Sequence, residues 1–191
     1  MVSQFVSSHV KRLLGDLDFD FPAGTHAIGR LDDNSEGLLL LTTDKRVTRL
    51  VFLDAVPHQR QYLVMVQNHV TEETLKKLND GVSITIKNGE RYVAKPISVI
   101  RIDNPLFLYP YAADYREKYA NTWLLITLTE GKYRQVRKMV LAVKHRCLRL
   151  VRLSISDVQL GTLAPGDVRE VDAHYFSSQL RIKFPIEQLL N

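Results

Sequence analysis

The sequence predicts an α+β fold, built on a largely antiparallel mixed β-sheet with flanking helices. Two observations support this class: strand-like and helix-like segments are mixed along the chain, and one strand pair is joined by a tight hairpin. At 191 residues the chain is long enough for one full hydrophobic core, or for two small subdomains that share one. It contains no internal repeat and no low-complexity tract.

The first clear elements are a strand and the helix that follows it. Side chains of the β-forming residues Tyr62, Val64 and Val66 recur at every second position of residues 61–66, which predicts a strand. Thr71 is a suitable N-cap, and the acids after it favour the positive end of a helix dipole. We expect this helix to end at Gly81, a residue that tolerates left-handed geometry.

A hairpin is expected next. Residues 82–86 form a second strand, and Asn88-Gly89 is the dipeptide best suited to a tight turn in which both central positions have positive φ. The return strand is expected over 91–102, and the Pro- and Tyr-rich residues 104–120 form a long surface loop.

The second half predicts three strands and one helix. Residues 123–129 have strong β-former content, residues 134–143 have helical periodicity, and residues 148–155 return as a strand. A last short strand is expected around 168–171, after turns rich in Gly and Pro.

The positive charge of the chain, +5 in total, is local. Residues 130–152 hold eight Lys and Arg but one acid, whereas the remaining residues hold 18 basic and 20 acidic side chains. Within this stretch the helix 134–143 has an apolar face of Val136, Met139, Val140 and Val143 and an opposite face of Arg134, Arg137 and Lys138. This basic stripe fits a polyanion ligand, although a solvated basic face explains the charge equally well.

Several classes of protein are excluded by what the chain lacks. Cys147 is the single cysteine, so an internal disulfide and a Cys-based zinc cluster are excluded, and the six histidines have no metal-ligand spacing. Nucleotide-binding glycine motifs, a bilayer-length apolar run and a secretory signal are also missing. We expect a cytoplasmic protein.

Two segments are candidates for chemistry. The polar loop 29–37 contains Arg30, Asp32, Asp33 and Glu36, and four leucines after it, 38–41, predict a buried strand. On that pattern alone, ordinary turn chemistry of Asp and Asn is the stronger explanation. The second segment, 130–139, joins a buried strand to the basic helix, and phosphate binding without catalysis explains it as well.

Taken together, the two segments resemble the RsuA-type pseudouridine synthases of ribosomal RNA. Gly29-Arg30-Leu31-Asp32, followed by Ser35-Glu36-Gly37 and the leucines, resembles the active-site signature of that family. Glu130-Gly131, followed by Arg134-Gln135-Val136-Arg137-Lys138-Met139, resembles its later arginine motif. Arg60-Gln61-Tyr62 resembles its tyrosine motif, in which lysine is more common two places before the tyrosine.

The resemblance extends over roughly 3–171. Leu148-Arg149-Leu150 and the turn at 161–166 resemble the closing segment, and residues 115–124 look most like the large-subunit synthase E branch. Many relatives begin with a small RNA-binding S4 domain, for which there is no room before Asp32, and the usual Lys-Pro strand is missing. The resemblance therefore implies one catalytic domain over 1–191, without an S4 domain, in which two subdomains share one sheet around a central cleft.

The reaction implied by the resemblance is isomerisation of a uridine to pseudouridine. Asp32 would be the catalytic carboxylate, which needs a cation nearby to stay ionised when water is excluded. Arg137 matches the family position that pairs with this aspartate, where a guanidinium can bind bidentately. Tyr62 would stack on the extruded uracil.

Binding of the RNA is assigned to basic residues on the same grounds. Arg30 would hold the flipped-out nucleotide or the gap that it leaves, and further phosphate contacts are expected from Lys132, Arg134, Lys138, Arg149 and Arg152. The partner implied is ribosomal RNA of the large subunit, bound by a monomer without metal or organic cofactor and without a membrane. Two other classes stay open: a non-catalytic RNA-binding or ribosome-assembly module, and a nucleoside hydrolase.

Overall fold

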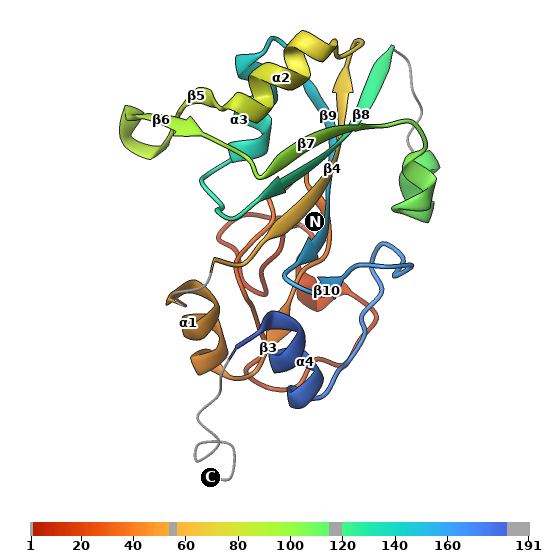
Figure 1. The fold of residues 1–191 in the computed structure, drawn as a ribbon. Coiled ribbons are helices and arrows are strands. Elements are labelled where there is room, and N and C mark those ends of the chain that lie inside the picture. The colour runs from red at the N-terminus through yellow and green to blue at the C-terminus, as the bar shows by residue number, and fades with distance from the viewer. Residues whose placement is uncertain (1, 54–56, 115–119, 183–191) are drawn as a thin grey trace.

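The computed structural model describes residues 2–53, 57–114 and 120–182, arranged around one six-stranded sheet (Figure 1). The strand order is β10-β9-β4-β8-β7, with β2 pairing beside β9. The β2–β9 pair is parallel, whereas the other pairs in the sheet are antiparallel, which confirms the predicted α+β class. The strands are β2 (Glu36–Gly37), β4 (Arg60–Gln67), β7 (Ser98–Ile102), β8 (Asn121–Leu128), β9 (Cys147–Ile155) and β10 (Val158–Gln159).

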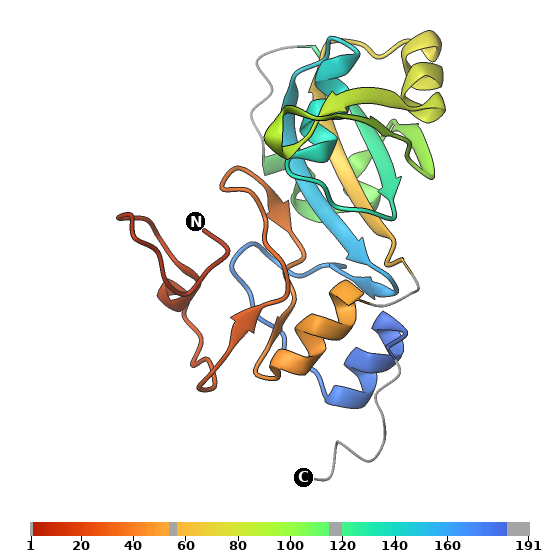
Figure 2. The ribbon, with the colours of Figure 1, turned by 90° about the vertical axis from the view of Figure 1, so that its left-hand side faces the viewer.

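Both faces of the sheet are covered, as the central strand β4 shows. Its residues Leu63 to Val66 are all fully buried. Leu63 and Met65 pack in one hydrophobic cluster, and Val64 and Val66 pack in the other, as the period of two in a strand requires. Strands β4 and β9 therefore belong to two cores and run through both halves of the molecule (Figure 2).

One end of the sheet is covered by two helices and a hairpin (Figure 1). Helix α2 (Glu72–Asp80) begins after Thr71, whose Oγ1 accepts a hydrogen bond from the Thr74 amide, and ends at Gly81 with φ +106°, as predicted. The hairpin consists of β5 (Val82–Thr85) and β6 (Arg91–Ala94). Helix α3 (Gln135–Ala142) completes this half.

The hairpin is confirmed, but its turn and its return strand differ from the prediction. Asn88-Gly89 belongs to a 3-10 turn, η2 (Lys87–Gly89), instead of a turn with two positive φ angles. The return strand 91–102 is divided into β6 and β7, which pair with β5 and β8 respectively. Pro96 lies between them and has no N–H for a ladder, so the chain leaves one strand pair and joins another there.

The long loop after β7 contains two short 3-10 turns. They are η3 (Pro105–Phe107) and η4 (Pro110–Asp114). Residues 115–119 of the predicted loop lie outside the described residues.

The other end of the molecule holds the N-terminal and C-terminal elements (Figure 1). They are η1 (Leu14–Asp16), a two-stranded sheet of β1 (His26–Ala27) and β3 (Leu41–Thr42), α1 (Lys45–Leu53) and α4 (Ala173–Leu180). The predicted strand over 168–171 is wrong: those residues have no strand pairing and lead to Asp172, the N-cap of α4.

The predicted single strand over the four leucines, 38–41, is also wrong. Leu38 and Leu40 are buried, but the Leu38 amide bonds the Arg152 carbonyl at 2.8 Å, and the Leu40 carbonyl accepts from Ile28, also at 2.8 Å. The run thus crosses from the edge of β9 to the small β1–β3 sheet. Apolar composition predicted the burial, but it cannot show that the hydrogen-bond partner changes.

Candidate active site

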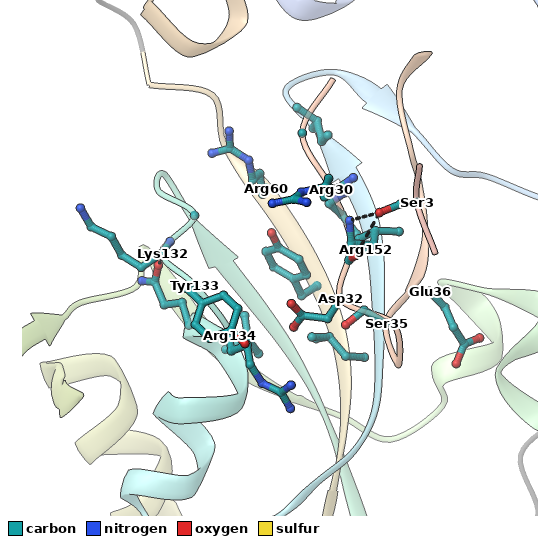
Figure 3. A pocket seen from close by; sticks show the side chains of 18 of the residues that line it. Ser3, Arg30, Asp32, Ser35, Glu36, Arg60, Lys132, Tyr133, Arg134 and Arg152 are labelled. Carbon is teal, nitrogen blue, oxygen red and sulfur yellow. Dashed lines mark hydrogen bonds between the residues drawn. The ribbon is translucent and has the colours of Figure 1, made fainter. Parts of the chain in front are cut away.

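A pocket of about 990 Å³ opens where the predicted catalytic segments meet. Its lining includes the loop 29–36, the beginning of β4, the middle of β9 and the turn 130–136. Figure 3 shows Asp32, Arg30, Arg60 and Arg152 on one side, facing the side chains of the 132–134 turn across the opening. Segments about 30 to 120 residues apart in the sequence therefore meet around one carboxylate.

Asp32 and Arg137 are brought together as the sequence resemblance implied. Arg137 Nε lies 3.8 Å from Asp32 Oδ2, and the two side chains are 9% and 26% exposed. The contact is single and long, not the expected bidentate pair. Arg137 Nη2 instead donates to the Asn34 carbonyl at 2.6 Å and to Ser35 Oγ at 3.2 Å, while the buried Nε has no hydrogen-bond partner among the described residues.

The loop that carries Asp32 is held at both ends. Ser3 Oγ accepts a hydrogen bond from the Leu31 amide at 2.9 Å and donates to the Leu31 carbonyl at 3.0 Å. After the loop, Gly37 has φ +95° and pairs with Arg152 of β9. A Cβ on Gly37 would lie 2.3 Å from the Arg152 carbonyl oxygen, so this close approach requires glycine.

Tyr62 and Arg152 are cross-strand neighbours at the floor of the pocket. Arg152 is 6% exposed, and its Nε donates to the Leu38 carbonyl at 2.8 Å. Burial lowers the pKa of the Arg152 guanidinium from its ordinary value, and the adjacent Tyr62 hydroxyl acts in the opposite direction. Arg152 therefore lies beneath the site on β9 and contacts Tyr62 on the neighbouring strand β4.

The predicted phosphate contacts fall into different environments. Arg30, Lys132 and Arg134 are exposed and line the pocket. Lys138 is half-buried outside the pocket lining, where its Nζ donates to the Thr85 carbonyl at 2.6 Å. Three exposed cations thus lie where a polyanion would approach.

The structure argues against the predicted phosphate contact of Arg149, which is 5% exposed. Its Nε and Nη2 donate to the Glu36 carboxylate at 2.9 and 2.8 Å, and Nη1 donates to the Tyr111 and Ala112 carbonyls at 3.0 and 2.9 Å. With its donors engaged and its surface covered, Arg149 connects β9 to the loop 29–37 and to η4. Arg149 is therefore a structural residue and not a phosphate contact.

Sequence reasoning missed two pocket residues, Arg60 and Tyr133. Arg60 stands where the tyrosine motif more often has lysine, and the resemblance implies no role for it. Tyr133 lies inside the basic motif but is 63% exposed at the opening of the pocket. Periodicity could have suggested its exposure, since it precedes the helix and falls on no apolar face.

Within residues 2–53, 57–114 and 120–182, no three His, Cys, Asp or Glu side chains gather in a way that could hold a metal ion. Over the same ranges no helix has the length and apolarity to cross a bilayer.

Comparison with known proteins identifies the family. Residues 15–142 match the RNA pseudouridylate synthase family. The chain belongs to this family. RNA pseudouridine synthases are isomerases, so the predictions of family and reaction class are confirmed.

Named relatives of this synthase agree with the branch that the sequence suggested. It is 35% identical to the ribosomal large subunit pseudouridine synthase E of Vibrio parahaemolyticus, over 89% of this chain and 69% of that protein. The enzyme of the same name from Xanthomonas axonopodis is 36% identical over 86% of this chain and 85% of its own length. A solved pseudouridylate synthase superposes with a TM-score of 0.65 at 26% identity, covering 84% of this chain and 63% of that structure.

Proposed function

We propose that this synthase converts one uridine of large-subunit ribosomal RNA to pseudouridine, with Asp32 as the catalytic carboxylate. The relatives named above act on the large ribosomal subunit according to their names. The observation that carries the residue assignment is the pocket of about 990 Å³ in which Asp32 lies 3.8 Å from Arg137. A carboxylate beside a guanidinium, in a pocket surrounded by basic residues, suits chemistry on a polyanionic substrate.

The reaction is a rearrangement within one nucleotide. The N-glycosidic bond of uridine breaks, the uracil turns, and a C-glycosidic bond forms between the ribose and a ring carbon of the same uracil. That carbon loses its proton, and the ring nitrogen released from the ribose gains one, so the product is an isomer of the substrate. Asp32 acts either as a nucleophile or as a general base. As a nucleophile it attacks the uracil or the ribose carbon, and as a general base it removes a ribose proton. Arg137 stabilises the ionised carboxylate, and the Tyr62 ring stacks on the extruded uracil.

Binding of the RNA is assigned to residues at the opening and the floor of the pocket. Arg30, Lys132 and Arg134 are exposed there and contact phosphates in this proposal. Lys138 lies outside the pocket lining, and we propose a phosphate contact for it beyond the opening. Arg152 is buried, so we assign it to the floor beneath Tyr62 in place of the predicted phosphate contact.

Replacing Asp32 with Asn tests the assignment, because the amide keeps the size of the side chain and removes its charge. We expect pseudouridine formation in a large-subunit ribosomal RNA transcript, measured by carbodiimide labelling, to vanish while RNA binding persists. Asp33→Asn is the matched control: Asp33 is the next residue, is 57% exposed and pairs with Lys11. Undiminished product from Asp32→Asn contradicts the assignment. A wild-type protein that binds the RNA but forms no pseudouridine supports the non-catalytic alternative.

We further propose that the protein works as a cytoplasmic monomer without a metal or organic cofactor. The specific activity is then expected to be unchanged after dialysis against a chelator. It is also expected to stay constant as the protein is diluted. Activity that is lost on chelation and restored by a divalent cation contradicts the metal-free proposal.

A further inference from the structure

We propose that Tyr133 is a stacking platform for the base next to the target uridine. This inference rests on the proposed function, and it assigns a ligand to a side chain that the reaction itself does not use. Tyr133 is 63% exposed but lines the same pocket as Asp32. In Figure 3 it projects from the turn between Lys132 and Arg134, across the pocket opening from Asp32. An exposed aromatic ring alone is unremarkable on a protein surface, so its surroundings decide the case.

The ring of Tyr133 is supported by a fixed cation. Lys138 Nζ lies 5.2 Å from the ring centroid, within the range of a cation–π contact. The same Nζ donates to the Thr85 carbonyl at 2.6 Å, so Lys138 is held against strand β5 while it contacts the ring. No aromatic ring packs on Tyr133 within the described part of the chain. A ring supported in this way can still accept a stacked base.

The turn that carries Tyr133 is tightly bonded before any ligand arrives. Gln135 is buried, and its Nε2 donates to Glu130 Oε1 at 2.6 Å while its Oε1 accepts from the Lys132 amide at 2.9 Å. The Tyr92 hydroxyl donates to the other Glu130 oxygen, and this hydrogen bond raises the pKa of Tyr92. Because the backbone of the turn is already ordered, stacking on Tyr133 fixes little more than one side chain.

The charges beside the ring indicate a nucleotide as the ligand. Lys132 and Arg134 are exposed on either side of Tyr133 and form no ion pair within the described residues. Lys132 Nζ lies 5.1 Å from the centroid of the Tyr92 ring, a contact that leaves its charge without an acidic partner. An aromatic ring with cations of this kind beside it is the arrangement by which proteins bind single-stranded nucleic acid: bases stack on the ring, and phosphates meet the cations. When a uridine is extruded toward Asp32, its neighbour in the strand loses a stacking partner, and Tyr133 lies at the opening where that neighbour emerges.

The test compares Tyr133→Ala with Tyr133→Phe on a large-subunit ribosomal RNA transcript. Loss of one stacked base is worth a factor of about five to one hundred in affinity. We expect Tyr133→Ala to raise KM at least about fivefold with kcat changed less than about twofold, and Tyr133→Phe to match the wild type. Phe107→Ala is the control, because Phe107 is 88% exposed on η3 and does not line this pocket.

Two further measurements distinguish the loss of a stacked base from the loss of a phosphate contact and from a change in folding. In a short RNA that copies the modified site, 2-aminopurine beside the target uridine should be quenched by the wild type and by Tyr133→Phe, but not by Tyr133→Ala. The slope of log affinity against log salt should be the same for Tyr133→Ala as for the wild type, because stacking releases no counterions.

The failures of the two proposals are distinguishable. Wild-type KM and quenching in Tyr133→Ala overturn the stacking platform, while product formation that depends on Asp32 leaves the proposed function standing. If the wild type forms no pseudouridine, the proposed function fails, and the stacking platform fails with it.

Discussion

Asp32 and Arg137 lie within ion-pair range without sharing a hydrogen bond. The 3.8 Å contact runs from Arg137 Nε, whereas Nη2 of the same guanidinium is bonded to the loop at Asn34 and Ser35. Arg137 thus fixes the loop through one nitrogen and faces the carboxylate with another. The same guanidinium therefore places a positive charge near Asp32 and holds the loop that carries Asp32.

Arg137→Met removes both contributions. We expect turnover to fall at least about a hundredfold, the scale of losing a charge-stabilising partner. We also expect the free energy of unfolding to fall by about 1–3 kcal/mol, because the loop loses two hydrogen bonds to a nearly buried group. Single-turnover assays and urea denaturation measure the two effects. Arg137→Lys keeps the positive charge but not the planar set of guanidinium donors, so we expect partial activity. Full activity in Arg137→Met contradicts the pairing.

Gly37 sets how closely the catalytic loop approaches β9. We expect Gly37→Ala to lower the free energy of unfolding by about 2–4 kcal/mol, because strain at positive φ is combined with a Cβ 2.3 Å from a carbonyl oxygen. Gly24→Ala is the matched control: its φ is +82° but no atom lies within 4 Å of the added Cβ, so we expect a loss of about 1 kcal/mol. Equal losses in urea denaturation contradict the close-approach argument.

The three arginines 137, 149 and 152 show what the sequence could and could not reveal at this scale. All belong to one basic stretch, and nothing local distinguishes them. In the structure Arg137 faces Asp32, Arg149 is bonded to Glu36, and Arg152 lies beneath Tyr62. Their roles depend on partners from distant segments, which charge and spacing do not specify.

Elements were predictable where local signals and tertiary pairing agree. Helix α2 has its cap, its acidic first turn and its terminal glycine in sequence, and strand β4 has the alternation that both cores require. Prediction failed where pairing changes within a segment, as at leucines 38–41 and at Pro96. Burial can be inferred from composition, but the identity of the neighbouring strand cannot.

The N-cap of α2 can be tested in isolation. Thr71 Oγ1 accepts from the Thr74 amide at 3.2 Å, so Thr71→Ala leaves one helix donor without this partner. We expect the free energy of unfolding to fall by about 1 kcal/mol, with activity unchanged because α2 does not line the pocket. Thr71→Ser should retain most of the stability. Thermal or urea denaturation measures this, and equal stability of the Ala and Ser variants contradicts the capping role.

On the scale of the whole molecule, the exposed basic residues at the pocket opening differ from a surface lysine that forms a local ion pair. Lys76 on α2, for example, pairs with Asp80 and is 74% exposed, away from the pocket lining. Lys132 and Arg134 are exposed at the opening without such partners among the described residues. Lys76 and Lys132 therefore differ in position: Lys132 faces the proposed RNA path, and Lys76 does not.

This difference predicts how affinity depends on salt. Each phosphate neutralised by a lysine releases counterions, so log affinity should fall linearly with log salt concentration. We expect Lys132→Gln to weaken binding of the ribosomal RNA transcript and to reduce that slope by about one, because one phosphate contact is lost. Lys76→Gln removes the same charge from the molecule but no contact, so its slope should equal that of the wild type. Equal slopes for Lys132→Gln and Lys76→Gln contradict a localised phosphate path, since net charge alone then governs binding.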